Sequence, residues 1–131
     1  MLRVSYPTGL AGLADRYQAM VFDLWGVLHD GVQLYPEVMP TLTALRRAGR
    51  KIGIISNSPR PVAFAAANIA QKFGLTAEHY DVLYTSGQLA YEALRDRPDV
   101  WTQQLGQRCL VIGPPHETAP YLALGLQAVT E

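Results

Sequence analysis

The chain has 131 residues, of which 49% are hydrophobic and 17% are charged, so it can bury one core and is not a disordered chain. Its 11 basic and 11 acidic residues cancel without a long run of either sign, which argues against a nucleic-acid-binding surface. The single cysteine excludes an internal disulfide, and no stretch approaches the roughly 18 apolar residues of a membrane span, so we expect a soluble cytoplasmic protein.

Short β-rich runs alternate with segments of helical periodicity along the chain. In chain order we expect a strand at 19–24, a helix at 37–48, a strand at 51–56, a helix at 59–73, a strand at 81–84, a helix at 86–95, a strand at 108–112, a helix that ends by residue 125 and a strand at 127–130. In the helix at 37–48, Val38, Leu42 and Leu45 form one apolar stripe. The alternation predicts an α/β fold, a Rossmann-like three-layer parallel sheet with crossover helices.

Asp23 follows directly after the apolar run 19–22, where a buried strand should end. In open α/β sheets, ligands bind outside the carboxyl ends of the strands. A carboxylate there is a competent nucleophile toward phosphorus, and Gly26 lets the backbone approach the group that it attacks. Residues 27–36 are too many for a simple strand-to-helix turn and predict a small hairpin flap that controls access to Asp23.

A second strand end follows at residues 54–60. Ser58 suits the N-cap of a helix and Pro59 its first position, so Ser56 and Asn57 would point their polar side chains where backbone N–H groups are free. This arrangement predicts an anion site made of neutral donors. Either strand end alone is also an ordinary cap or turn, but the two together, in consecutive β–α units, are more specific.

At these residues the chain resembles the haloacid dehalogenase-like hydrolase superfamily, and within it the class IIA enzymes, whose cap domain (type C2) is inserted after the second motif. The first motif is similar to residues 22–31, the second to residues 54–60, and the segment leading to the cap to residues 84–87. The resemblance covers nearly the whole chain. It implies a magnesium-dependent hydrolase of small phosphorylated metabolites, with an aspartyl-phosphate intermediate.

The same resemblance assigns roles to five residues. Asp23 would be the nucleophile and a ligand of Mg²⁺, and Trp25 would lend its backbone carbonyl to the metal. Ser56 would hydrogen-bond the phosphoryl group, with Asn57 and Arg60 as neighbouring phosphate or substrate contacts. The implied partner is a small metabolite rather than nucleic acid or a membrane, and homo-oligomerisation stays open.

Trp25 departs from the phosphatase pattern, which has a second aspartate at this position. Indole cannot act as a general acid or base near neutral pH, and such a group is worth roughly 10²–10⁴-fold in rate. His29 or Asp30 of the flap could substitute. An aromatic residue here also resembles the dehalogenase branch, where the leaving halide needs no proton, so carbon–halogen hydrolysis is an alternative.

The family's third motif, a lysine, and its fourth, an acidic pair that completes the metal site, have no match before Glu131. Residues 108–131 resemble the start of the inserted cap, so we expect residues 1–107 to be the N-terminal part of the core. The resemblance then implies a truncated hydrolase with half a magnesium site, inactive by itself. Two alternatives remain, a non-catalytic anion-binding or assembly module of the same fold and a phospho-accepting receiver domain.

Overall fold

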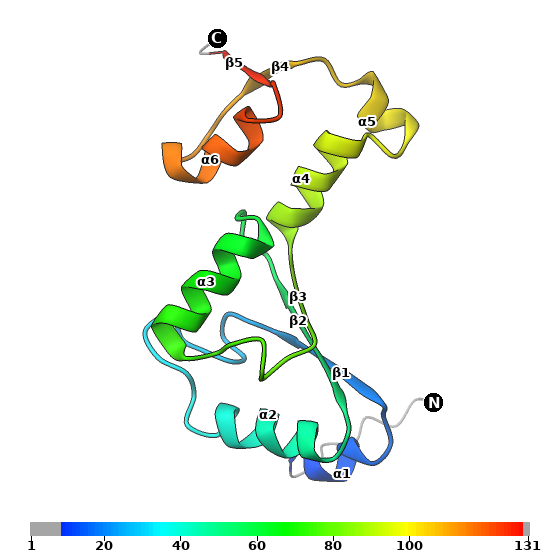
Figure 1. Cartoon of the computed structure of the whole chain (residues 1–131), viewed down its shortest axis with the longest axis vertical. Helices are drawn as coiled ribbons and strands as arrows, with labels where there is room; N and C mark the ends of the chain where they lie inside the picture. The colour runs from blue at the N-terminus through cyan, green and yellow to red at the C-terminus, as the bar shows by residue number, and fades with distance from the viewer. Residues whose placement is uncertain (1–8, 130–131) are drawn as a thin grey trace, which may run out of the picture. The chain divides into compact units, whose positions relative to one another are not determined.

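The computed structural model describes residues 9–129 (Figure 1). The helices are α1 (Ala11–Ala14), α2 (Val38–Arg47), α3 (Val62–Phe73), α4 (Ser86–Asp96), α5 (Val100–Gln104) and α6 (Pro115–Leu122). The strands are β1 (Ala19–Asp23), β2 (Lys51–Ser56), β3 (Val82–Thr85), β4 (Arg108–Leu110) and β5 (Gln127–Val129). Every predicted strand and helix is present, with ends shifted by up to three residues, except that Thr130, in the last predicted strand, lies outside the described residues. None of the helices described here has the length and hydrophobicity that a membrane span requires.

Two helices were not predicted, α1 and α5, because each is too short to show a hydrophobic period. The sequence does carry one signal for α5. The Asp99 carboxylate accepts a hydrogen bond from the Thr102 N–H at 2.8 Å, and the Thr102 hydroxyl is 3.3 Å from the Asp99 N–H. Such a capping box marks a helix start that hydrophobic periodicity alone misses.

The chain divides into two compact units. The first consists of Met1–Ile55 and Ile69–Leu83, and the second of Ser56–Asn68 and Tyr84–Glu131. This division does not coincide with the boundary expected at residue 107. The assignment of residues 108–131 to the start of a cap stays a prediction.

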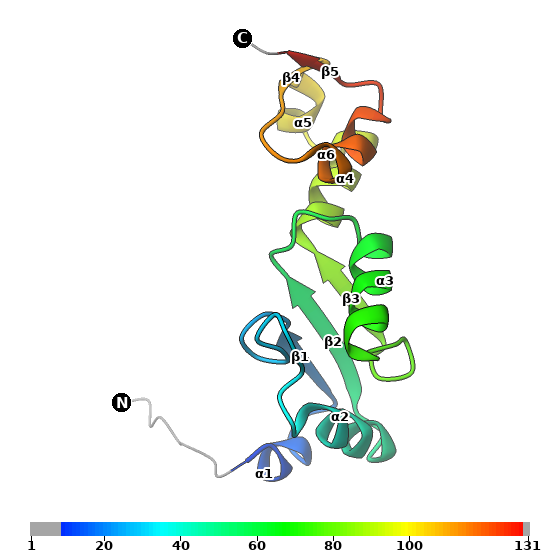
Figure 2. The same ribbon diagram turned by 90° about the vertical axis from the view of Figure 1, so that its left-hand side faces the viewer.

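The first unit is built on a sheet with the strand order β1-β2-β3. β1 and β2 pair in parallel, with Asp23 opposite Ile55. The order of these strands across the sheet is also their order along the chain. Because crossovers between parallel strands are right-handed, the helices that connect them lie on one face of the sheet. Figure 2 shows α3 alongside β2 and β3. The interior of this unit is formed by the buried residues Leu42, Leu45, Ile52, Ile54, Ile69 and Leu75. The predicted Rossmann-like α/β fold is thus confirmed as a partial core.

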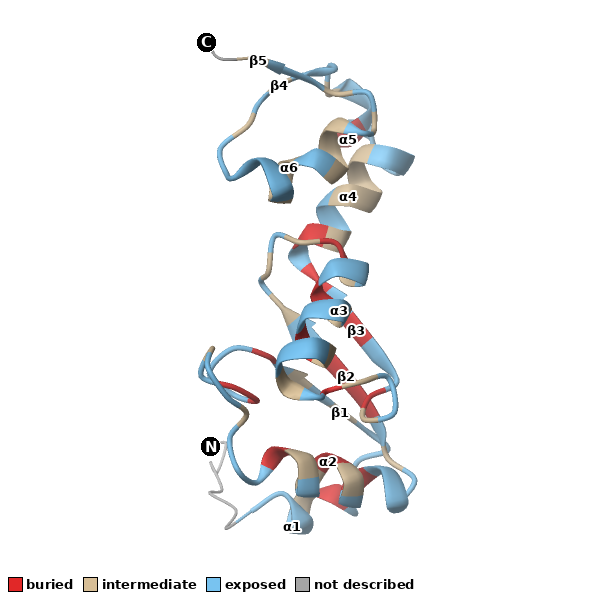
Figure 3. Cartoon of the chain, turned by 60° about the vertical axis from the view of Figure 1, so that its left-hand side comes forward, coloured by how far each residue is buried: buried red, intermediate tan, exposed pale blue. Residues whose placement is uncertain are grey.

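The opposite face of this sheet is open (Figure 3). Val21, Ile55 and Val82 are 65%, 51% and 54% exposed. Parallel sheets are normally covered on both faces, so the described residues supply two of the three expected layers. The expectation of a buried strand before Asp23 was wrong for this chain, because β1 is an edge strand with a single neighbour and none of its residues is buried.

The second unit contains a smaller parallel pair. β4 pairs with β5, with Cys109 opposite Ala128, and α6 lies between these strands in sequence. An apolar cavity of about 350 Å³ is bordered by residues of α4, β4 and α6. The half-buried Cys109 lines it, which agrees with its interpretation as an apolar rather than a reactive residue.

Candidate active site

Asp23 is the last residue of β1, and its side chain is exposed. The strand ladder continues one residue further, since the Leu24 N–H donates to the Ile55 carbonyl at 3.1 Å. Leu24 itself is only 5% exposed and anchors the strand end in the interior. The carboxylate therefore stands at the carboxyl end of a parallel strand, the position expected from the sequence.

A second oxygen atom that could ligate a metal ion, the Trp25 backbone carbonyl, lies two residues further along the chain. The Gly26 N–H donates to the His29 carbonyl at 2.7 Å, and the Leu24 carbonyl accepts from Leu28 and His29. Among the backbone hydrogen bonds of residues 9–129, the Trp25 carbonyl accepts none. Mg²⁺ is typically held by one or two carboxylates together with water and phosphate oxygens. Asp23 and the Trp25 carbonyl fit part of such a site, and within the same residues no cluster of three or more acidic, histidine or cysteine side chains completes it.

A flap was predicted at residues 27–36; in the structure the residues after β1 fold back on themselves over residues 24–35, and the flap is defined by these residues from here on. His29 forms isolated bridges with both Trp25 and Leu34, and the Tyr35 N–H donates to the Leu28 carbonyl at 3.1 Å. Lys72, near the end of α3, donates to the Gly31 carbonyl at 2.5 Å. These bonds tie the flap to itself and to α3.

The Trp25 indole lies against Gly31 and His29 of the same flap, while 63% of the residue is exposed. Its ring meets the His29 ring edge-on, with centroids 5.2 Å apart and an interplanar angle of 77°. Gly31 has φ +95°, and a Cβ there would lie 2.3 Å from the indole Cη2. A glycine is therefore needed at position 31 both for its backbone conformation and to leave room for the indole.

In the second unit, the loop at 56–60 differs from the predicted helix start. α3 begins at Val62, so the expected Ser58 cap and Pro59 first position were wrong. The Ser56 hydroxyl accepts the Ser58 N–H at 3.2 Å, and the Ser58 hydroxyl accepts the Arg60 N–H at 3.3 Å. Such local side-chain bonds compete with helix formation. They also occupy two of the N–H groups that were expected to bind an anion.

Arg60, an expected phosphate contact, pairs with Glu117 of α6. Its Nε and Nη2 donate to the same carboxylate oxygen of Glu117 at 3.0 and 2.8 Å, and both side chains are partly exposed. The Tyr121 hydroxyl donates to the Pro59 carbonyl at 2.5 Å. Sequence reasoning missed Glu117 and Tyr121, because contacts across about sixty residues carry no local signal.

Comparisons with known proteins identify the family of the chain. The family model described as "Haloacid dehalogenase-like hydrolase" matches residues 20–127. The chain belongs to this family. The chain is similar to a haloacid dehalogenase-like hydrolase from Brucella suis 1330, with 31% identity and a TM-score of 0.79 over 95% of this chain and 44% of that one.

A hypothetical protein from Pyrococcus horikoshii OT3 shares the fold, with a TM-score of 0.57 and 22% identity over 86% of this chain and 41% of that one. The chain thus spans less than half the length of both solved structures. No curated protein matches it. Membership of the haloacid dehalogenase-like family supports a hydrolase function in general.

Because this member of the haloacid dehalogenase-like family has no acidic residue at position 25, His29 and Asp30 were the candidate acids. His29 is 5% exposed, is stacked on Phe73 with centroids 4.5 Å apart, and accepts the Gly31 N–H at Nδ1. The Asp30 carboxylate accepts the N–H groups of Val32 and Gln33, which lowers its pKa. Both residues stabilise the flap, and the structure does not favour either as the acid.

Because His29 is buried, we expect the folding stability of this chain to depend on pH. Burial lowers the pKa of His29 below 6.5, Lys72 lowers it further, and the charges of Asp30 and Asp23 oppose the shift. Below pH 6.5 the unfolded chain takes up the proton first, so folding stability should fall as the pH drops from 6.5 toward the folded pKa. We expect an NMR titration midpoint for His29 below 6.5, and a steeper loss of unfolding free energy between pH 7 and 5.5 than in His29→Asn. Equal slopes in the two proteins would contradict this.

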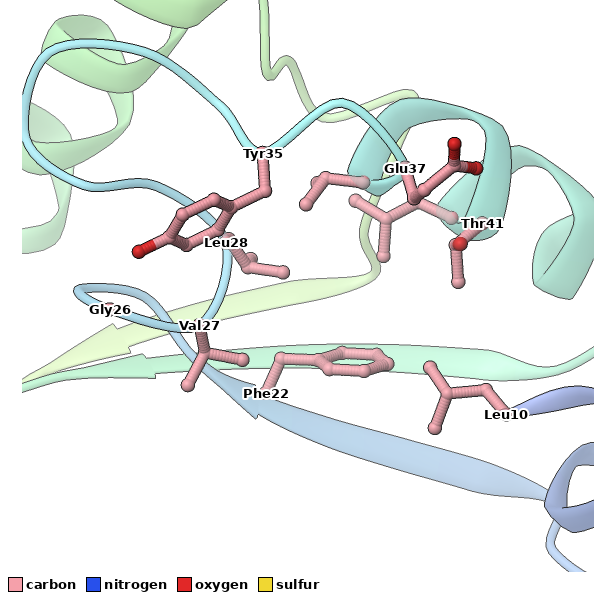
Figure 4. A pocket seen from close by; sticks show the side chains of 10 residues that line it. Leu10, Phe22, Gly26, Val27, Leu28, Tyr35, Glu37 and Thr41 are labelled. Carbon is pink, nitrogen blue, oxygen red and sulfur yellow. The ribbon is translucent and has the colours of Figure 1, made fainter. Parts of the chain in front are cut away.

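An apolar cavity of about 340 Å³ lies on the other side of β1. Figure 4 shows the Phe22 ring between Val27 and Leu10, with Tyr35 above. Successive strand residues point to opposite faces, so the cavity opens on the side of Phe22 and not of Asp23. It is therefore separate from the candidate active site at the end of β1.

Proposed function

We propose that this chain forms the nucleophile-bearing part of a magnesium-dependent phosphatase that acts on small phosphorylated metabolites in the cytoplasm through an aspartyl-phosphate at Asp23. One observation carries the proposal. The exposed Asp23 carboxylate stands at the carboxyl end of β1, two residues before a backbone carbonyl that accepts no backbone hydrogen bond among residues 9–129. This segment lies within the part of the chain that matches the hydrolase family.

In this mechanism an Asp23 oxygen attacks phosphorus, the bond to the leaving oxygen breaks, and water later hydrolyses the acyl phosphate. Bound Mg²⁺ would neutralise charge on the phosphoryl oxygens. The Asp23 carboxylate and the Trp25 carbonyl are the oxygens that would hold it. Ser56 and Asn57 would donate to the phosphoryl group as neutral donors.

Arg60 would contribute positive charge to phosphate binding. Glu117 occupies its Nε and one Nη2 proton, which leaves the guanidinium with further N–H groups for a phosphate oxygen. Glu117 thus fixes the direction of the guanidinium without using all of its donors. Arg60 would therefore have an accessory role, because Glu117 partly balances its charge.

The test uses beryllofluoride, a phosphoryl mimic that forms an adduct with an aspartate nucleophile. With Mg²⁺ present, ¹⁹F NMR should detect bound beryllofluoride, and Asp23→Asn should weaken its binding by about tenfold or more because the carboxylate oxygen is lost. Asp15→Asn is the matched control, since Asp15 carries an exposed carboxylate in the same unit. Equal affinity in wild type and Asp23→Asn would reject the nucleophile and favour a non-catalytic anion-binding module.

Trp25 favours one other reaction. A halide leaves without protonation, so carbon–halogen hydrolysis needs no acid at position 25. The same Asp23 oxygen would then attack carbon and form an alkyl ester. Mass spectrometry after incubation with chloroacetate would detect the added group on Asp23, and its absence would leave phosphate esters as the substrates.

A further inference from the structure

The second unit holds an ion pair at a residue that is expected to bind phosphate. Arg60 lies in the loop after β2, and Glu117 lies in the first turn of α6. The Arg60 Nε and Nη2 atoms donate to one Glu117 oxygen, Oε1, at 3.0 and 2.8 Å. Nε and Nη2 form one of the edges of a guanidinium that can hold an anion with two parallel hydrogen bonds. A carboxylate of the chain itself therefore occupies an anion-binding edge of Arg60.

The geometry of this pair makes it displaceable. An arginine–carboxylate pair is strongest when two N–H groups reach two different oxygens, whereas here both donate to one. The Arg60 and Glu117 side chains are 37% and 23% exposed, so water screens their attraction. A phosphate group offers several acceptor oxygens and about two negative charges at neutral pH, against the single charge of Glu117. A phosphate can therefore compete with Glu117 for the same edge of Arg60.

Glu117 keeps a favourable environment when it leaves Arg60. It lies in the first turn of α6, where the helix dipole stabilises a negative charge. The Tyr121 hydroxyl, one turn further along α6, donates to the Pro59 carbonyl at 2.5 Å and holds the helix to the loop independently of Glu117. The exchange of Glu117 for a phosphate therefore requires only that the Glu117 side chain rotates.

We propose that Glu117 is an internal competitor of phosphate at Arg60. This inference rests on the phosphate contact that the proposed function assigns to Arg60. With Glu117 in place, a phosphate reaches only the remaining Nη protons of a cation whose charge is partly balanced. A phosphate that takes the Nε and Nη2 protons instead gains the whole charge of Arg60, and Glu117 turns into solvent. The carboxylate on α6 thereby lowers the affinity of the loop for anions.

Competition within one chain has a recognisable signature. Only the fraction of molecules in which Arg60 is free of Glu117 binds an anion at this edge, and that fraction does not depend on which anion arrives. Removing Glu117 should therefore tighten the binding of different anions by the same factor. If Glu117 served only to orient Arg60, its removal would weaken binding, so the sign of the change distinguishes the two roles.

The test measures the binding of inorganic phosphate and of sulfate to the full chain, with Mg²⁺ and at constant ionic strength, from ¹H–¹⁵N NMR shifts of residues 56–60. We expect Glu117→Gln to tighten the binding of both anions by the same factor, about three- to fivefold, as expected for a partly exposed ion pair. Glu117→Ala should reproduce this gain. In an Arg60→Gln background the gain from Glu117→Gln should vanish. In the wild-type chain, phosphate should shift the side-chain carboxyl ¹³C signal of Glu117 toward that of a solvent-exposed glutamate.

Asp96→Asn is the matched control, because Asp96 pairs with Arg95 in the same unit and its loss removes the same charge. Unchanged or weaker phosphate binding in Glu117→Gln, or an equal gain in Asp96→Asn, would overturn the inference. If phosphate binding depends on Mg²⁺ and Asp23 but not on Glu117, only this inference fails. If Glu117→Gln tightens phosphate binding that Asp23→Asn leaves unchanged, the competition is supported and the proposed nucleophile fails.

Discussion

Gly87→Ala should lower the free energy of unfolding by about 2–3 kcal/mol, because it inserts a methyl group where two backbone segments touch. A Cβ at position 87 would lie 2.1 Å from the Pro59 carbonyl oxygen and 2.6 Å from the Arg60 nitrogen. No positive φ is recorded for Gly87. Close approach of the backbone is therefore the reason for a glycine at this position.

The loop cannot move aside without losing hydrogen bonds. The Gly87 N–H donates to the Ser58 carbonyl at 3.0 Å, and the buried Thr85 hydroxyl donates to the Arg60 carbonyl at 2.6 Å. The Tyr121 hydroxyl donates to the Pro59 carbonyl and also lies 3.0 Å from the Gly87 carbonyl oxygen, so the two carbonyls share its single proton. Because this network fixes the segment that carries the expected phosphate contacts, Gly87→Ala should also weaken anion binding.

Chemical denaturation measures the change in stability, with Gly12→Ala as the control. Gly12 is also helical, but nothing lies within 4 Å of a Cβ built there. Alanine at Gly12 should leave stability unchanged or raise it by up to about 1 kcal/mol. Similar effects of the two substitutions would contradict the close contact between Gly87 and the loop.

Trp25→Asp should raise the hydrolysis of ethyl phosphate by roughly 100-fold or more, the typical contribution of a general acid. A carboxyl group two residues after Asp23 could protonate the departing alkoxide and then activate water. For 4-nitrophenyl phosphate the increase should be much smaller, because its leaving group needs no proton. Comparing the two esters thus shows how much of the hydrolysis rate is lost because no acid protonates the leaving group.

Hydrolysis rates can be measured only on an active protein, and we expect residues 1–131 to be inactive by themselves. We would join residues 1–131 to the part of the Brucella suis hydrolase that the chain does not match, and measure release of phosphate. Trp101→Asp is the control for a charge placed at a tryptophan of similar exposure. Thermal melting would reveal any loss of stability from the removed contacts with Gly31 and His29. An equal gain with both esters, or no gain, would mean that position 25 does not limit departure of the leaving group.

Elements with a clear local pattern were predictable from the sequence. β2 was predicted with its observed bounds, and α2 differs by one residue at each end. Their hydrophobic periods, and the glycine at position 49 after α2, are local properties of the chain. The start of α3 was misplaced by three residues because the Ser56 and Ser58 hydroxyls form turns instead of a cap.

The sequence by itself determined the family, the α/β alternation and the place of Asp23 and Trp25 at a strand end, because these depend on neighbouring residues. Only the tertiary structure decided that His29 and Asp30 serve the flap, that the indole rests on Gly31 and stays exposed, and that Glu117 holds Arg60. Those contacts depend on how the backbone folds back on itself. A hydrogen bond or a close approach between distant residues exists only after the chain has packed, and no periodicity in the sequence encodes it.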